Sequence, residues 1–356
     1  MANDDVSVEI LTRLPLKSLF RFKCVSKAWH GLISNDDYLR RRLPLLTSAV
    51  FYHCSAANRE PRFACTSNDA GELRECGLEF FPLHGKSDIV DCCGGLLLAY
   101  SASSASFYVL SPITKRWAGL PPARRTTLLS VLAFDSYHSK GYKVVSFAGW
   151  LPQGSQIEVF SSSTGGWAER RVHWGIDSDS LTASLRYFAG TLYVLAYPHH
   201  IVAIDLDDDA LPCRLIDLPV GVKPGACVDR SGGRLHYACE EEGRIKVWAL
   251  EGGGGGGGGG WALRYSVDAD AILRRVPGNL QQKQLHLLAV HPEREGVVYL
   301  RTPGRIVAYD LGKEELGEIC EFRKEEEKEE KEKEKTYLVQ IWVFPFSRYM
   351  SDCLAN

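Results

Sequence analysis

The spacing of apolar residues divides the chain into a short helical segment and a long β-rich one. Near the N-terminus Val6, Ile10, Leu11 and Leu14 recur at intervals that place them on one face of an amphipathic helix. Pro15 ends this pattern, because the residue before a proline avoids the helical region.

Further short helices are predicted as far as about residue 43. Ser26 is positioned to cap one that carries Trp29 and Ile33, and Asn35 or Asp36 to cap the next. Forty residues bury little core, so such a module depends on a neighbour for stability. Two interpretations follow from the pattern alone: a module that binds a partner protein, or a helical cap on the larger domain.

After residue 50 the pattern changes to short apolar or alternating runs separated by Gly, Pro and Asp, which predicts β-strands. One unit recurs: a Gly, two strands joined by a turn, and then a Trp or a Leu-Pro pair. Its equivalent positions are Leu110, Phe160, Ile204, Trp248 and Tyr309. They are spaced by 50, 44, 44 and 61 residues, and the last interval is about 52 without the nine glycines of 252–260. Such a period is typical of four-stranded propeller blades.

A weaker copy of the unit is expected around residues 62–65 and 78–81, which brings the expected blade number to six, with seven as the alternative. The apolar run 337–343 is predicted to close the ring by pairing with the first blade. An open β-sandwich is the competing architecture, and the regular spacing disfavours it.

The composition argues against several classes of protein. A formal net charge of −2 argues against nucleic acid as the main partner, because binding to phosphates needs a basic face. The eleven cysteines lack Cys-x-x-Cys spacing, which is typical of reduced thiols in the cytoplasm or nucleus. The longest stretch without charge, residues 92–114, contains Gly, Pro and several Ser, so it predicts two strands and not a membrane span.

No convergent set of catalytic residues is recognised in the sequence, and no cofactor site is predicted. No metal site is predicted either, since adjacent residues such as His199 and His200 point to opposite faces of a strand. The acidic run 205–209 lacks the glycine and glutamate of a calcium loop. The glycines of 252–260 and the charged run 323–335 are interpreted as insertions.

Residues 8–19 and 22–29, read as Val-Glu-Ile-Leu-Thr-Arg-Leu-Pro-Leu-Lys-Ser-Leu and Phe-Lys-Cys-Val-Ser-Lys-Ala-Trp, resemble the F-box of plant F-box proteins. The resemblance implies a helical module that binds a Skp-type adaptor and, through it, a cullin. The positions that it assigns to adaptor contact or to the core of the module are Ile10, Leu11, Leu14, Pro15, Leu16, Leu19, Cys24, Val25 and Trp29. The family usually opens with Leu-Pro, which is missing here, so weaker adaptor binding is expected.

Residues 93–98, 111–117 and 134–145 resemble the kelch-like domain associated with F-boxes in plants. The expected organisation is a small all-α F-box over residues 1–46 followed by an all-β propeller over residues 47–356. The resemblance implies a non-catalytic subunit of an SCF-type ubiquitin ligase, with an unknown target protein on the propeller. A propeller scaffold or co-regulator that engages no cullin is the alternative, and a propeller enzyme is a third, disfavoured interpretation.

Overall fold

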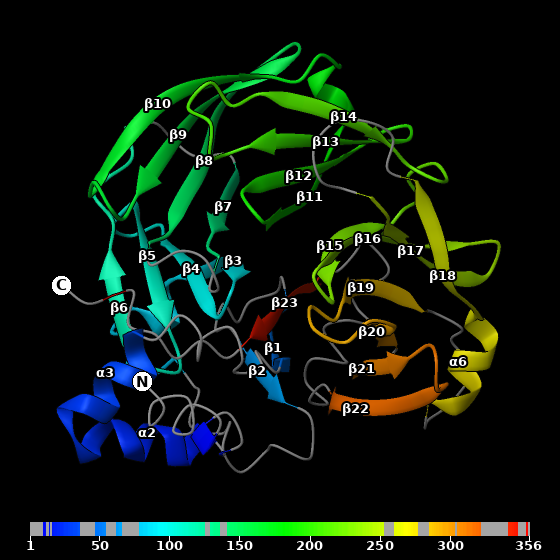
Figure 1. Ribbon diagram of the computed structural model, residues 1–356. Helices are drawn as coiled ribbons and strands as arrows, with labels where there is room; N and C mark the ends of the chain where they lie inside the picture. Colours follow the sequence, from blue (N-terminus) through cyan, green and yellow to red (C-terminus); the bar gives the residue numbers. More distant parts are fainter. Residues whose placement is uncertain are drawn as a thin grey trace.

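The computed structural model describes residues 10–11, 14, 16–35, 47–54, 62–65, 78–124, 129–135, 141–252, 260–276, 285–302, 305–321, 341–347 and 354. Within these ranges, N-terminal helices precede a ring of β-sheets (Figure 1). The helices are α2 (Leu16–Val25) and α3 (Lys27–Asn35). The helix expected after Asn35 lies outside the described residues. No helix in the described part of the chain is long and apolar enough to span a membrane.

Five sheets of four antiparallel strands follow one another in chain order, and each strand pairs with the next along the chain. The first two are built from β3 (Asp88–Cys93), β4 (Leu96–Ser101), β5 (Ser106–Ser111) and β6 (Arg116–Gly119), then β7 (Leu129–Ala133), β8 (Lys143–Leu151), β9 (Gly154–Ser161) and β10 (Gly166–His173). The third and fourth contain β11 (Leu181–Phe188), β12 (Thr191–Ala196), β13 (His200–Asp205) and β14 (Cys213–Asp217), then β15 (Cys227–Ser231), β16 (Arg234–Glu241), β17 (Arg244–Leu250) and β18 (Trp261–Asp268). The fifth contains β19 (His286–Val290), β20 (Val297–Thr302), β21 (Arg305–Asp310) and β22 (Glu315–Glu321).

A sixth sheet joins the two ends of the propeller sequence. It contains β1 (Thr47–Cys54), β2 (Arg62–Cys65) and β23 (Ile341–Ser347), with β23 antiparallel to β1. The first strands of the five larger sheets lie towards the middle of the ring, and β23 contacts two of them, β3 and β19 (Figure 1). The ring is therefore closed by a strand from the C-terminal region, as the sequence predicted, although the paired residues are 341–347 and residues 337–340 lie outside the described part.

The repeat predicted from spacing corresponds to one structural position. Its five reference residues lie on the third strand of each four-stranded sheet, and each pairs with an apolar residue of the second strand. The pairs are Leu97 with Leu110, Val144 with Phe160, Leu192 with Ile204, Tyr237 with Trp248, and Val298 with Tyr309. The 44-to-61-residue interval is thus the distance along the chain from one sheet to the next.

The prediction of a strand at residues 78–81 was wrong. This segment forms a turn in which the backbone N–H of Phe81 donates to the carbonyl of Leu78 at 2.9 Å. Leu78 and Phe81 are buried, and the Phe81 ring packs 5.2 Å from that of Tyr108 and 5.6 Å from that of Trp117. The apolar run reflects burial against β5 and β6, and it pairs with no strand in the described part of the chain.

The core consists of apolar layers between neighbouring sheets. Two tryptophans on outer strands form hydrogen bonds with the preceding sheet or the segment that follows it. Trp167 Nε1 donates to the carbonyl of Pro121 at 2.8 Å, and Trp261 Nε1 donates to the carbonyl of Asp217 at 2.7 Å. One further helix, α6 (Ala269–Arg275), was not predicted; Asp268 caps it by accepting from the N–H of Ala271. Short 3₁₀ turns are η2 (His84–Lys86) and η3 (Ser178–Ser180).

Candidate functional site

The F-box helices are separated at Ser26. The Ser26 hydroxyl accepts a hydrogen bond from the backbone N–H of Trp29 at 3.2 Å, which is the capping contact predicted from the sequence. The indole of Trp29 packs against the ring of Phe22, with centroids 5.3 Å apart. This contact between the two helices fixes the position of α3 against α2.

The predicted adaptor-contact residues divide into buried and exposed ones. Leu11 is fully buried, and Ile33, which was not in the predicted set, is buried as well. Leu14 and Trp29 are half-buried. In contrast, the side chain of Ile10 is 54% exposed, that of Val25 is 66% exposed, and Cys24 is also exposed. Leu16 and Leu19 lie in α2, whereas Pro15 lies outside the described residues.

The exposed β-branched side chains of Ile10 and Val25 leave apolar area in water. Burying Ile10 or Val25 against another protein would recover about 1.5–3 kcal/mol each. The buried side chain of Leu11 is used within the module itself. The structure therefore separates a core residue from two surface residues that the sequence placed in one group.

A second polar feature lies on the inner strands of the ring. Asp91 on β3, Arg186 on β11 and Asp229 on β15 each precede the turn glycine of their hairpin by four residues. Nε of Arg186 lies 3.3 Å from Oδ1 of Asp229, and the charge of Arg186 also acts on Asp91. These three charges were missed in the sequence, although the repeated spacing to Gly95, Gly190 and Gly233 was a usable signal.

The two carboxyl groups are also bound by backbone amides. Oδ2 of Asp91 accepts from the N–H of Leu132 on the next inner strand at 2.7 Å, and Oδ1 accepts from that of Cys92. Burial nevertheless raises the pKa of Asp91 to about 6, and Arg186 opposes this shift. Burial likewise raises the pKa of Asp229. Since these groups are only 7% and 8% exposed, their arrangement ties neighbouring sheets together and leaves little surface for a ligand.

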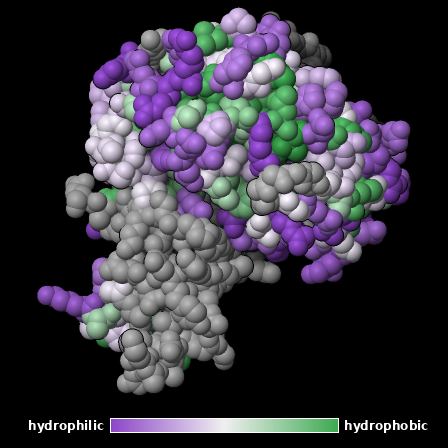
Figure 2. All heavy atoms as spheres, turned by 45° about the horizontal axis from the view of Figure 1, so that its top comes forward, coloured by the Kyte–Doolittle hydropathy of each residue, from purple (hydrophilic) through white to green (hydrophobic). Residues whose placement is uncertain are grey.

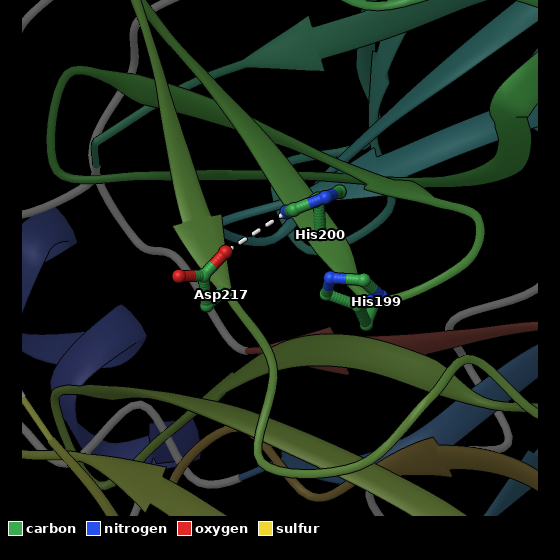
Figure 3. A group of neighbouring side chains, drawn as sticks. All are labelled: His199, His200 and Asp217. Atoms are coloured by element: carbon green, nitrogen blue, oxygen red, sulfur yellow. Dashed lines mark ion pairs between the residues drawn. The ribbon is translucent and has the colours of Figure 1, made fainter.

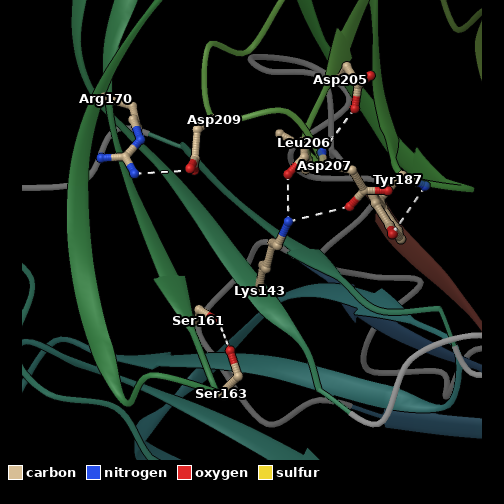
Figure 4. Close-up of polar contacts among 10 residues, drawn as sticks. Lys143, Ser161, Ser163, Arg170, Tyr187, Asp205, Leu206, Asp207 and Asp209 are labelled. Atoms are coloured by element: carbon tan, nitrogen blue, oxygen red, sulfur yellow. Dashed lines mark hydrogen bonds and ion pairs between the residues drawn. The ribbon is translucent and has the colours of Figure 1, made fainter.

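The acidic run 205–209 ties the second and third sheets together. Nζ of Lys143 donates to the carbonyl of Leu206 at 2.5 Å and to Asp207, and Arg170 pairs with Asp209 at 3.3 Å (Figure 4). Asp205 accepts from the backbone N–H of Asp207. The carboxylates of this run are therefore directed at cations and amides of the protein itself.

Two exposed aromatic residues lie on one face of the ring, in addition to Trp117 on the outer strand β6. Trp150, at the end of β8, is 44% exposed and packs on the rings of Phe147 and Trp174. Tyr197, in the turn between β12 and β13, is 45% exposed. Hydrogen bonds through η3 connect the two turns, from Ser178 N–H to the carbonyl of Pro152 and from Tyr197 N–H to that of Ser180. Figure 2 shows one side of the molecule, on which hydrophilic residues predominate and apolar residues form patches among them.

His199 and His200 lie on the same face, and they do not diverge as the sequence analysis expected. His199 belongs to the turn and only His200 begins β13, so the alternation of side chains along a strand does not separate them. Their ring centroids are 4.2 Å apart, and Asp217 from β14 lies beside them (Figure 3).

Comparisons with known proteins agree with this architecture. Residues 3–41 match the F-box domain, and residues 65–352 match the family described as F-box protein At3g26010-like, beta-propeller. The F-box protein At5g07610 of Arabidopsis thaliana is 24% identical, over 90% of this chain and 86% of the relative. The putative F-box/kelch-repeat protein At1g15680 of the same plant is 27% identical, over 86% and 81%. The F-box protein At5g49610 is 29% identical, over 84% and 88%.

The propeller match covers most of the chain, and it begins at residue 65, after the F-box match has ended at residue 41. Helices α2 and α3 lie within the F-box match, and β3 to β22, together with α6, lie within the propeller match. The chain therefore belongs to the family of F-box proteins with an At3g26010-like β-propeller.

Proposed function

We propose that this protein is the substrate-recognition subunit of an SCF-type ubiquitin ligase. The F-box binds a Skp-type adaptor and, through it, a cullin, while the propeller holds the target protein. The observation that carries this proposal is the fusion of an F-box, over residues 3–41, to a propeller over residues 65–352. In this function the protein itself performs no chemistry: it accelerates ubiquitin transfer by holding a target lysine close to the conjugating enzyme. The cytoplasm or nucleus is the expected compartment.

The adaptor-binding surface is assigned to the exposed apolar side chains of the F-box, Ile10 and Val25, together with Cys24. Leu11 supports this surface from within the module, because it is fully buried. The remaining predicted positions stay in the proposed surface or its support: Leu14, Pro15, Leu16, Leu19 and Trp29.

We assign six blades to the propeller, with the sheet of β1, β2 and β23 as the sixth. The support is the ring of contacts among inner strands, which runs from β3 through β7, β11, β15 and β19 to β23 and back to β3. The domain boundary is placed before Thr47, where β1 begins, which gives an F-box over residues 1–46 and a propeller over 47–356.

The target-binding face is assigned to the connections that carry Trp150 and Tyr197. Large aromatic side chains supply much of the binding energy of protein interfaces, and both of these are nearly half exposed. They lie on adjacent sheets connected through η3, so one partner could cover both.

Val25→Asp in the full-length protein tests the adaptor assignment. Since Val25 is 66% exposed, the substitution leaves the fold intact, but it places a charge in the apolar contact. We expect retention of the Skp-type adaptor and cullin to fall at least about tenfold, the equivalent of about 1.4 kcal/mol. Quantitative co-purification measures this loss.

Leu263→Asp is the matched control, because Leu263 is an exposed apolar residue of β18 and is 52% exposed. It should leave adaptor retention unchanged. If the unaltered protein retains neither adaptor nor cullin, the alternative function holds, in which the propeller is an interaction scaffold or co-regulator without a cullin. Equally strong retention by the unaltered protein and Val25→Asp would overturn the assignment of Val25 to the adaptor contact.

A further inference from the structure

His199, His200 and Asp217 form a compact group of two imidazoles and one carboxylate (Figure 3). Their candidate ligand atoms all lie within 4.8 Å of one another. Nδ1 of His200 is 3.0 Å from Oδ1 of Asp217. Ligands of a tetrahedral ion bound at 2.0–2.1 Å lie about 3.3 Å apart, so this pair already has nearly the required separation.

The backbone around the group is fixed by hydrogen bonds. His200 and Asp217 are direct cross-strand partners in the β13–β14 ladder. The carbonyl of His199 accepts from the N–H of Leu218 at 2.8 Å. The carbonyl of Asp217 accepts from the indole of Trp261, which belongs to the neighbouring sheet, at 2.7 Å. Because the backbone is held from two sheets, only side-chain rotation is needed to bring the three ligand atoms together.

Among the described residues, one ring nitrogen of His200 is left without a hydrogen bond. Its Nδ1 atom is shielded from solvent, and within the described part of the chain it has no hydrogen-bond partner of acceptable geometry. Its contact with the Asp217 carboxylate is therefore one of proximity alone. A shielded nitrogen without a hydrogen bond costs free energy, and a cation placed between this nitrogen and the carboxylate would satisfy both.

We propose that His199, His200 and Asp217 bind a divalent transition-metal ion of the zinc class. Imidazole nitrogens favour such ions over calcium and magnesium, which prefer oxygen ligands. Three protein ligands leave the fourth tetrahedral position for water or for a side chain of a bound protein. His199 and Asp217 are exposed, so the ion is accessible from the face that carries Tyr197.

The test uses the full-length protein with Zn²⁺ in calorimetry and with Co²⁺ in visible absorption spectroscopy. We expect the intense absorption of tetrahedral Co²⁺ in the unaltered protein and its displacement by one equivalent of Zn²⁺. His199→Ala and Asp217→Asn should each weaken the affinity of this site at least about tenfold. His199 is exposed and Asn is close in size to Asp, so both variants retain the fold.

His173→Ala is the control, because His173 is an exposed histidine of β10 outside the group. It should bind Zn²⁺ and Co²⁺ as the unaltered protein does. Absence of the tetrahedral Co²⁺ spectrum overturns the proposal. So does equal affinity in the unaltered protein and His199→Ala, because the ion would then be bound by cysteines or histidines elsewhere. Neither result depends on adaptor binding.

Discussion

At the scale of single residues, the charges of the inner strands show how buried polar groups are accommodated. Asp91, Arg186 and Asp229 occupy equivalent positions on three inner strands. The ring therefore places them at a similar level along its central axis. An isolated buried charge would be strongly destabilising, and here each carboxylate has the guanidinium and backbone amides as partners. Removing Arg186 would leave two acids close together without a compensating cation.

The pKa of Asp91 provides a residue-scale prediction. Burial raises it from 3.8 to about 6, so between these values the folded protein binds this proton more tightly than the unfolded chain. The stability from this group is therefore fully present below about pH 4 and is lost as the pH rises through 6, a change of about 3 kcal/mol. An NMR titration of the Asp91 carboxyl carbon should show a midpoint near 6.

Arg186→Met should raise the pKa of Asp91 further, because the opposing positive charge is removed. Arg170→Met is the control: Arg170 pairs with Asp209 at the outer strand β10 and should leave the Asp91 titration unchanged. A midpoint near 4 in the unaltered protein would contradict the buried, charged arrangement.

At the scale of elements, hairpin turns set how closely neighbouring sheets approach. Several turn glycines have a positive φ, but their surroundings differ. Gly296 has a φ of +84°, and a Cβ there would lie 2.6 Å from Cζ of Tyr265 on the neighbouring sheet. Gly243 has a φ of +71° and an open environment. The first glycine therefore serves both the turn and the packing between sheets, and the second serves only the turn.

Gly296→Ala and Gly243→Ala separate these two roles. Gly243→Ala should lower the free energy of unfolding by about 1 kcal/mol, the cost of a side chain in the left-handed region. Gly296→Ala should lower the free energy of unfolding by about 1–3 kcal/mol more than Gly243→Ala does, because the added methyl group displaces Tyr265. Urea denaturation of both variants measures the difference. Equal losses of unfolding free energy would show that the Tyr265 side chain moves aside without destabilising the protein.

At the scale of the whole molecule, the pairing of β1 with β23 closes the ring. The two strands come from residues 47–54 and 341–347, so nearly the whole propeller sequence lies between them. Each sheet packs its apolar side chains against its neighbours in the ring, and an opened ring exposes the apolar layer on both sides of the gap. The stability of the propeller therefore depends on contacts between the two ends of its sequence.

Replacing residues 341–347 by a Gly/Ser segment of equal length should lower the melting temperature by about 10 °C or more. It should also promote self-association through the unpaired edge of β1. Thermal unfolding and size-exclusion chromatography measure the two effects. An unchanged melting temperature would mean that the other sheets hold the ring closed alone.

Shortening the nine glycines of 252–260 to four is the control, because it alters a connection between β17 and β18 and leaves the pairing of β1 with β23 intact. The base of this loop is closed by the hydrogen bond from the N–H of Glu251 to the carbonyl of Gly260 at 2.9 Å. Loop-closure entropy predicts a gain of only about 0.7 kcal/mol, so the melting temperature should hardly move.

The sequence by itself determined the two kinds of architecture and the period of the repeat, because helical and strand spacing and turn glycines are local properties of the chain. The capping role of Ser26 and the closing strand were also predictable, since each rests on a short pattern. The turn at Leu78–Phe81 was not, because an apolar run indicates burial and cannot say whether a strand partner is present.

Tertiary structure decided which side chains meet. Only folding showed that Leu11 is buried while Ile10 and Val25 are exposed, since all three fit the same apolar pattern. Only the β13–β14 pairing brought Asp217 beside His200, across a separation of 17 residues. Contacts between distant residues depend on register and on the packing of neighbouring sheets, and neither is encoded in any one segment of the chain.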